Sequence, residues 1–371
     1  MSDKVFFLLS DLGFGGTARA TTLVVNGLAA AGSDVTMVVV RRGGHHESML
    51  DRRIRLISLD AGTARGPAML LALPRLVRLL RQERPAKLVS AGNHVHVLAS
   101  TAHRFARIPE TQLILKMTNP VERPNKSVLA NKLRGAWYAR AFRRATRILL
   151  IDDSARGELA DSLDAPADKL VVVDNPYITD AMVAAGQADR EPEPGLLLAI
   201  GRLVPQKNYP LMLSALARLP DVPWSLDILG DGPLRTKLEG QARDLGIADR
   251  VRFRGYVPDP VPYLRHSAAL LLTSRWEGQG AVLLEALASG CPVIATRSGP
   301  AVEAVLGGGR FGRLTTGDAA QPLADAVRAE LESPLKVEGA REWVERYRVG
   351  PGVQSHARAL GFDLRVKSNP G

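Results

Sequence analysis

Short runs rich in Val, Ile and Leu alternate with longer helical patterns along this chain, and this alternation constrains the fold more than any other feature. It is typical of βαβ units whose strands form a parallel sheet. A first series predicts a helix over residues 17–31 and strands at 5–10, 34–40, 87–90, 113–116, 148–151 and 170–173. These elements predict one doubly wound domain.

Residues 174–195 interrupt the pattern, and their Pro, Gly and charge content predicts an interdomain linker. A second series follows, with strands expected at 196–200, 225–230, 251–256, 268–274 and 292–296. We therefore expect an α/β protein with two Rossmann-like domains whose parallel sheets face a central cleft. Ligands of such sheets bind at the carboxyl ends of the strands, so we expect the functional site there.

The composition excludes several other classes of protein. A chain of 371 residues is long enough for about two domains with ordinary cores. Its single cysteine, Cys291, excludes an intramolecular disulfide and a Cys-based zinc cluster, and it favours a reducing compartment. No apolar run approaches the roughly 18 residues that span a bilayer, and the start lacks a cleavage site, so we expect a cytoplasmic protein.

The net charge of the chain indicates which classes of molecule it binds. The chain has 49 Lys and Arg against 38 Asp and Glu, a formal net charge of +11. Such an excess favours polyanions, anionic lipid headgroups or phosphorylated small molecules. Only 5% of the residues are aromatic, and there is neither a zinc-finger spacing nor an aromatic–Gly RNA-binding motif, so no nucleic-acid partner is expected.

Three loops after predicted strands of the second domain carry residues suited to a phosphorylated ligand. Arg202 and Lys207 stand at the end of a strand, where two cations are able to clamp a diphosphate. The glycines of residues 230–233 let the backbone approach a ligand, and backbone groups near Tyr256 and Val257 are able to read a base edge. Each loop taken alone is also typical of an ordinary basic surface loop or turn.

Residues 274–304 carry the strongest signal. Glu277 lies in a Gly-rich loop after a strand, a helix begins near Gly280, and Glu285 lies one to two turns inside that helix. The first amides of the helix attract phosphate or sugar oxygens. Because leucines flank Glu285 on a helix that we expect to be buried, its carboxylate needs a partner. We therefore favour a functional role for both glutamates over two ordinary surface acids.

Together these motifs resemble those of the retaining nucleotide-sugar glycosyltransferases of family four, which have the GT-B fold. The matching motifs keep the order of the family along nearly the whole chain: Gly15-Gly16, GRLVPQKN at 201–208, GDGP at 230–233, RGYV at 254–257, Glu277 with Glu285, and ALASGCPVIAT at 286–296. Ser298-Gly299-Pro300 with Glu303 resembles a subgroup that uses UDP-linked hexoses or N-acetylhexosamines. The resemblance implies transfer of a sugar with retention of its anomeric configuration.

The resemblance also implies residue roles. Arg202 and Lys207 hold the donor diphosphate and stabilise the charge that develops as the sugar leaves, while Glu277 contacts the sugar near its anomeric centre. Glu285 binds the ribose hydroxyls. Further donor contacts are expected from Gly16, Gly230, Tyr256, Val257, Gly280, Ala281, Val282 and Leu283. No cofactor and no metal are expected, because the sequence has no Asp-x-Asp triplet.

The first domain carries weaker signals. By the same resemblance, Gly15 and Gly16 let the first loop approach the diphosphate and the acceptor. Asn93 and His94 follow a predicted strand, where they either touch the donor sugar or acceptor or belong to the packed and solvated surroundings of a helix. The sequence leaves these two interpretations equal.

Residues 129–147 contain six cations and no acid. Helical spacing predicts one face formed by Arg140, Arg143, Arg144 and Arg147. Tyr138, Phe142 and Ala145 are expected roughly opposite this face, with Trp137 at the border. This segment is either a helix that docks on anionic lipid or a solvated face over an ordinary core.

We divide the chain into an acceptor-binding domain at 1–180, a nucleotide-sugar-binding domain at 181–352 and a helix at 353–371 that crosses back to the first domain. The expected function is transfer of a hexose or N-acetylhexosamine from a UDP-sugar to a bacterial envelope glycan or lipid-linked acceptor, in the cytoplasm or at the inner face of the membrane. The alternatives are a nucleotide-sugar epimerase of the same fold and a non-catalytic basic protein that binds membranes or polyanions.

Overall fold

The computed structural model describes residues 4–61, 71–119, 121, 127–163, 165–187, 190–317 and 319–364. The chain divides into two compact units, called here unit 1 (Met1–Pro176 with Val349–Gly371) and unit 2 (Tyr177–Arg348). The boundaries fall at 176/177 and 348/349, where the sequence suggested 180/181 and 352/353. Each unit is built on one sheet.

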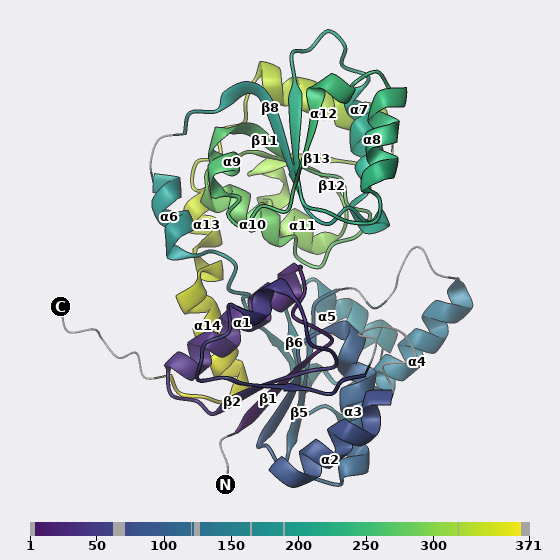
Figure 1. Ribbon diagram of the computed structural model, residues 1–371, viewed down its shortest axis with the longest axis vertical. Helices are drawn as coiled ribbons and strands as arrows, with labels where there is room; N and C mark the ends of the chain where they lie inside the picture. Colours follow the sequence, from purple (N-terminus) through teal and green to yellow (C-terminus); the bar gives the residue numbers. More distant parts are fainter. Residues whose placement is uncertain are drawn as a thin grey trace, which may run out of the picture. The chain divides into compact units, whose positions relative to one another are not determined.

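Unit 1 contains a seven-stranded parallel sheet of order β3-β2-β1-β4-β5-β6-β7 (Figure 1). All residues of β1 and β2 are buried, as expected for strands that helices cover on both faces. The strands are β1 (Val5–Leu9), β2 (Val35–Val39), β3 (Arg55–Ser58), β4 (Lys87–Ser90), β5 (Gln112–Met117), β6 (Arg147–Leu150) and β7 (Leu170–Val172).

Two sets of helices cover the unit 1 sheet. Helices α1 (Gly16–Ala30) and α14 (Val349–Leu360) pack against each other and share one core cluster with the sheet. Helices α2 (Leu73–Glu83), α3 (His96–Ala106) and α4 (Val128–Arg144) form the other cluster. The short helical segments are α5 (Ala155–Gly157), η1 (His45–Glu47), η3 (Asn93–Val95), η4 (Glu158–Ser162) and η5 (Ala167–Lys169).

Unit 2 contains a six-stranded parallel sheet of order β10-β9-β8-β11-β12-β13. Its strands are β8 (Glu193–Ile200), β9 (Ser225–Leu229), β10 (Val251–Gly255), β11 (Ser267–Leu272), β12 (Val293–Thr296) and β13 (Gly312–Thr315). Two Rossmann-like domains with parallel sheets, as the sequence predicted, are thus confirmed.

The helices of unit 2 also form two groups. Helices α7 (Tyr209–Leu216), α8 (Arg235–Asp244) and α12 (Ala320–Glu332) share a core cluster with the sheet. Helix α10 (Ala281–Ala288) packs instead with α6 (Asp180–Gln187), α11 (Pro300–Val305) and α13 (Ala340–Val344). The remaining segments are α9 (Val261–His266), η6 (Pro205–Lys207), η7 (Ala248–Arg250), η8 (Gly307–Gly309) and η9 (Glu345–Tyr347).

Several details differ from the sequence prediction. The edge strands β3 and β13 were not predicted, because they are short, partly exposed and lack a continuous apolar run. The predicted linker at 174–195 is wrong in its middle, where α6 packs on α10. Gly186 permits this contact, since a Cβ there would lie 2.2 Å from Ala288 O. Helix α14 begins at Val349, four residues before the helix predicted at 353–371, because Pro is tolerated in a first helical turn.

The basic segment also needs a correction. Helix α4 ends at Arg144, and Arg147 is the first residue of β6, so Arg147 does not share the helix face with Arg140, Arg143 and Arg144. The Arg147 guanidinium instead donates to Ala359 O in α14. The extended Ala145 cap, with φ −62° and ψ 142°, turns the chain out of the helix before Arg147.

Two further features of the sequence can be compared with the structure: the single cysteine and the length of the apolar segments. Cys291 is fully buried, and burial raises the pKa of its thiol to about 11. Among the described residues, no helix combines the length and the apolar character needed to cross a bilayer.

Candidate functional site

The switch point of the unit 2 sheet lies between β8 and β11, which are neighbours in the sheet but not in the sequence. From β8 the chain continues to α7, and from β11 it continues to α10. Parallel α/β sheets bind ligands at the carboxyl ends of the two strands where the order reverses. The predicted residues Arg202, Lys207 and Glu277 follow these two strand ends.

Close backbone contacts join the ends of β8, β9 and β10. Gly201 N–H donates to Leu229 O (2.9 Å), and Gly230 N–H donates to Gly255 O (2.6 Å). A Cβ at Gly230, whose φ is 130°, would lie 2.1 Å from Gly201 O, so only glycine fits there. The loops that carry Arg202, Gly230 and Tyr256 therefore begin together at one edge of the sheet.

Lys207 and Glu277 form an ion pair across the switch point. Lys207 Nζ lies 2.6 Å from Glu277 Oε1, and the two side chains are only 16% and 9% exposed. Ser274 Oγ, itself buried, also donates to Glu277 Oε1 at 2.6 Å. Because charge-assisted hydrogen bonds are strong at low exposure, this arrangement fixes the carboxylate and the ammonium at the strand ends.

Further hydrogen bonds connect the loops after β8 and β11. Thr273 Oγ1 donates to Lys207 O (3.0 Å), and Gln206 Nε2 donates to Trp276 O (2.9 Å). Arg275 N–H donates to Gln206 O at 2.8 Å. The backbone around Lys207 is thus held by the loop that carries Glu277.

Tyr209 supports the same loop from beneath. Its hydroxyl donates to Gly201 O (2.9 Å), and its ring is almost fully buried. Burial, with a smaller contribution from the Glu277 charge, raises the pKa of Tyr209 above its ordinary value. The hydroxyl therefore keeps its proton, and its hydrogen bond, through the physiological range.

Helix α10 begins at Ala281, four residues after Glu277 in the sequence. Gly280, in the left-handed region with φ 71°, precedes the helix, and Leu283 N–H already donates to Gly280 O (2.8 Å). The amides of Ala281 and Val282 lie in the first turn, where a helix supplies no acceptor. The side chains of Val282 and Leu283 are buried, so these residues reach a ligand only through their backbone.

Glu285 lies one turn inside α10 and is 5% exposed. Arg202 is half-buried in the loop after β8, and Val257 is half-buried after β10. Tyr256, 42% exposed, follows β10 directly. The structure thus joins Lys207 to Glu277 directly and places Arg202, Gly230, Tyr256 and Val257 on loops of the same sheet edge.

The corresponding switch point of unit 1 lies between β1 and β4. Gly15, with φ 150°, precedes α1, whose first residue is Gly16. Asn93 is buried, and its side chain bonds to the segment after β5: Nδ2 donates to Asn119 O (2.8 Å), and Oδ1 accepts from Thr118 N–H (2.8 Å). His94 is exposed. Asn93 therefore positions a neighbouring loop, and substrate contact by Asn93 or His94 stays a prediction.

Sequence reasoning missed the residues that hold this site together. Ser274, Thr273 and Tyr209 each bond to a predicted functional residue or to its loop. Small hydroxyl residues directly after an apolar strand, as in Thr273-Ser274, are the signal that was available. The partner of a hydroxyl depends on how two distant loops meet, which no local pattern reveals.

The arrangement is suited to an anion with several oxygens. An ammonium, a guanidinium in the same loop and the first amides of a helix all attract phosphate oxygens, whereas the two buried carboxylates accept hydrogen bonds from hydroxyl groups. Among the described residues, no group of three His, Cys, Asp or Glu side chains gathers as a metal site would.

Comparison with protein families agrees with this arrangement. Residues 15–176 match the glycosyl transferase 4-like domain, and residues 185–348 match the glycosyl transferases group 1. The two matches cover nearly the whole chain in the order of the two units. The chain therefore belongs to family four of the glycosyltransferases, a family of retaining hexosyltransferases.

Individual relatives of this chain are glycosyltransferases as well. Over 129 residues, 34% of this chain, it is 39% identical to the lipopolysaccharide core biosynthesis glycosyltransferase LpsE of Rhizobium meliloti, and this segment spans 37% of that relative. It is 27% identical to the 2-deoxystreptamine glucosyltransferase of Streptomyces kanamyceticus over 78% of this chain and 82% of that one.

A solved structure has the same fold. The chain resembles Anabaena HepE, solved in complex with UDP and glucose, with a TM-score of 0.78, 18% identity, and coverage of 96% of this chain and 99% of that one. The predicted GT-B fold is confirmed.

Proposed function

We propose that this protein transfers a hexose or N-acetylhexosamine from a UDP-sugar to a glycan or lipid-linked acceptor of the bacterial envelope, with retention of configuration. The observation that carries the proposal is the buried Lys207–Glu277 pair at the switch point of unit 2. The transfer breaks the bond between the anomeric carbon and the phosphate oxygen and forms one to an acceptor hydroxyl. The acceptor proton leaves with the departing diphosphate.

Lys207 is proposed to contact the donor diphosphate together with Arg202. In the structure, the Lys207 ammonium contacts Glu277, so an incoming phosphate shares this cation with the carboxylate. As the sugar–phosphate bond breaks, negative charge grows on the phosphate oxygens and strengthens their attraction to the ammonium. The same movement of charge leaves positive character on the sugar, which the neighbouring Glu277 carboxylate stabilises.

Glu285 is proposed to accept hydrogen bonds from the ribose, and the amides of Gly280, Ala281 and Val282 to donate to the diphosphate or sugar oxygens. A carboxylate that is 5% exposed gains from two hydroxyl donors at once. Leu283 is proposed to act mainly by shaping this turn, because its amide is already bonded to Gly280. Gly230, Tyr256 and Val257 are proposed to line the pocket for the base.

The choice of UDP and of an envelope acceptor is supported by relatives. Anabaena HepE was solved with UDP-glucose as well as with UDP, and LpsE of Rhizobium meliloti is named for lipopolysaccharide core biosynthesis. Unit 1 is proposed to bind the acceptor, with Gly15, Gly16, Asn93 and His94 near it. We propose that the reaction takes place in the cytoplasm, without a metal ion.

A panel of radiolabelled UDP-, GDP- and ADP-sugars tests the donor. Released nucleoside diphosphate is measured with and without a lipid-linked glycan extract as acceptor. We expect UDP-linked sugars alone to be consumed, and faster with the acceptor. Conversion of the nucleotide sugar into an epimer without acceptor would make the protein an epimerase, and the absence of any nucleotide binding would favour a non-catalytic protein.

The proposed hydrogen bonds between Glu285 and the ribose are tested by comparing two ligands that differ in one ribose hydroxyl. Titration with UDP and with 2′-deoxy-UDP should show about a tenfold preference for UDP, since a hydrogen bond to a charged group contributes about 1.5 kcal/mol or more. In Glu285→Gln the preference should shrink while the melting temperature stays close to that of the wild type. An unchanged preference in the variant would remove Glu285 from the ribose site.

A further inference from the structure

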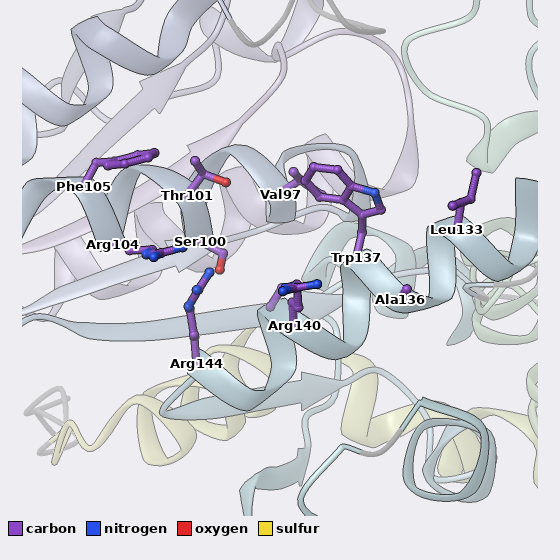
Figure 2. Close-up of a pocket in the computed structure, with 11 residues that line it drawn as sticks. Val97, Ser100, Thr101, Arg104, Phe105, Leu133, Ala136, Trp137, Arg140 and Arg144 are labelled. Carbon is purple, nitrogen blue, oxygen red and sulfur yellow. The ribbon is translucent and has the colours of Figure 1, made fainter.

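Unit 1 contains a groove between α3 and α4 that the proposed reaction does not use (Figure 2). Its volume is about 470 Å³, and both helices contribute side chains to it. The lining combines three guanidinium groups with an indole and a phenyl ring; the residues that carry these groups are Arg104, Arg140, Arg144, Trp137 and Phe105.

The cations of this groove have no acidic partner in the described part of the chain. Arg104, Arg140 and Arg144 form no ion pair with a described carboxylate. In unit 2, by contrast, exposed arginines such as Arg252 and Arg254 each pair with an aspartate. Figure 2 shows the side chains of Arg144 and Arg104 reaching toward each other from the two helices. Partial burial, followed by the charges of Arg104, Arg140 and Arg143, lowers the pKa of Arg144. Repulsion of this kind is relieved when an anion binds.

Three large apolar residues that line the groove are exposed. Phe105, Leu133 and Trp137 are 52%, 57% and 56% exposed, and Val128 and Leu129 at the start of α4 are 73% and 68% exposed. Five of the twelve large hydrophobic residues exposed in the described part of the chain thus lie on α3 and α4. Such a concentration on one surface marks an interaction site.

The apolar residues and the arginines occupy different parts of α4. Leu129, Leu133 and Trp137 follow each other at intervals of four residues, and Arg140 and Arg144 continue the same stripe toward the end of the helix. From Leu129 to Arg144 the helix rises about 22 Å. A ligand that matches this stripe has an apolar part beside the first turns and an anionic part beside the last.

We propose that the groove between α3 and α4 docks on a bilayer surface containing anionic phospholipid. Arg104, Arg140 and Arg144 bind headgroup phosphates, and Leu133 with Trp137 enters the boundary of the acyl chains. The structure thereby changes the face suggested by the sequence: Arg147 leaves it, and Arg104 of α3 joins it. The proposal concerns unit 1 alone and does not rest on the donor site of unit 2.

Vesicle co-sedimentation of the full chain tests the charged part. Phosphatidylcholine vesicles are compared with vesicles containing phosphatidylglycerol, for the wild type and for Arg104→Glu/Arg140→Glu/Arg144→Glu. The matched control is Arg52→Glu/Arg78→Glu/Arg243→Glu, three exposed arginines elsewhere. Each triple variant lowers the formal net charge from +11 by six, to +5. We expect the groove variant to lose about a hundredfold in partitioning to anionic vesicles, and the control to lose much less.

Brominated lipid tests the apolar part, because bromine quenches only tryptophan that enters the bilayer. Trp137 and Trp343 are 56% and 42% exposed, in unit 1 and unit 2 respectively. Quenching by brominated anionic vesicles should disappear in Trp137→Phe and persist in Trp343→Phe. UDP stabilisation measured in the same samples should be equal for all variants, so a failure of vesicle binding is distinguished from a failure of the donor site.

Three results would overturn the proposal. One is a wild-type chain that does not bind anionic vesicles. A second is equal loss in the groove and control variants, which would make binding a matter of net charge. The third is a groove variant that changes the oligomeric mass in solution without changing vesicle binding, which would assign the surface to a second copy of the chain.

Discussion

The switch points of the two units use the same sheet topology but different chemistry. In unit 2 the loops after β8 and β11 meet through a buried ion pair between Lys207 and Glu277. Next to the switch point of unit 1, which lies between β1 and β4, the loops after β4 and β5 meet through the neutral amide of Asn93. A charged junction is able to exchange its internal partner for a phosphate, whereas a satisfied amide mainly fixes a loop.

The interiors of the units differ as well. Unit 1 buries four bases, His46, His96, Lys116 and His356, and burial lowers the pKa of each. In unit 2, burial raises the pKa of Tyr209 and of Cys291 and thereby keeps both side chains protonated. We therefore expect the stability of unit 1 to depend more on pH around neutrality than that of unit 2.

The largest effect is expected from Lys207→Ala. Loss of the ammonium should lower turnover by about 10²- to 10³-fold, since it removes a group that stabilises charge in the transition state. UDP affinity should fall too, as measured by titration. The control is Lys4→Ala, which breaks the part-buried Lys4–Glu83 pair of unit 1 (2.7 Å). If both variants keep the turnover of the wild type, Lys207 has no part in the reaction.

The second-largest effect is expected in how the free energy of unfolding of unit 1 depends on pH. Burial lowers the pKa of Lys116 from 10.5 to about 7. Between these values the unfolded chain holds a proton that the folded unit lacks, so stability rises with pH. From pH 7 to about pH 9.5 the free energy of unfolding should rise by about 3 kcal/mol, and Lys116→Met should flatten this rise.

Hydrogen exchange during urea unfolding resolves this effect by unit. Peptides of β5 should become more protected from pH 7 to about pH 9.5 after correction for the intrinsic exchange rate, and peptides of β11 should change less. Equal changes in both strands, or the same rise in Lys116→Met as in the wild type, would show that Lys116 does not control the stability of unit 1.

Asn93→Ala should destabilise unit 1 by about 2 kcal/mol. The substitution leaves the buried Thr118 N–H without its acceptor, and an unsatisfied buried group costs about 1–3 kcal/mol. Thermal unfolding measures the loss. UDP affinity should not change, because the nucleotide is assigned to unit 2; a variant that is stable but binds UDP poorly would contradict this division of labour.

Ser274→Ala should have the smallest effect, about 1 kcal/mol in turnover or donor binding. It removes one of the two donors to Glu277 Oε1 and leaves the Lys207 ammonium in place. Steady-state kinetics with a UDP-sugar measures it, with Ser274→Thr as the conservative control. A loss as large as that of Lys207→Ala would mean that the serine, and not the lysine, orients the carboxylate.

Most of the fold followed from periodicity, because buried parallel strands are short apolar runs that local sequence displays. The strands missed, β3 and β13, lie at sheet edges where part of each side chain is exposed. The helix within the supposed linker was missed since its packing on α10 depends on Gly186 and the distant Ala288. Contacts between residues about one hundred positions apart leave no local pattern.

The candidate site was predictable in part for a similar reason. Lys207 and Glu277 each follow an apolar run, so topology alone brought them to one sheet edge. Their direct contact, and the bonds from Ser274 and Thr273, depend on loop geometry that spacing does not encode. The prediction that Arg147 belongs to the basic face failed because α4 ends at Arg144, and local spacing does not show where a helix ends.

A nucleoside diphosphate is proposed to bind at the switch point of unit 2. This binding is tested by hydrogen exchange of the full chain with and without saturating UDP. We expect protection in peptides covering residues 201–208, 230–234 and 274–283. Exchange that UDP leaves unchanged in those peptides, or protects only along α3 and α4 of unit 1, would contradict it.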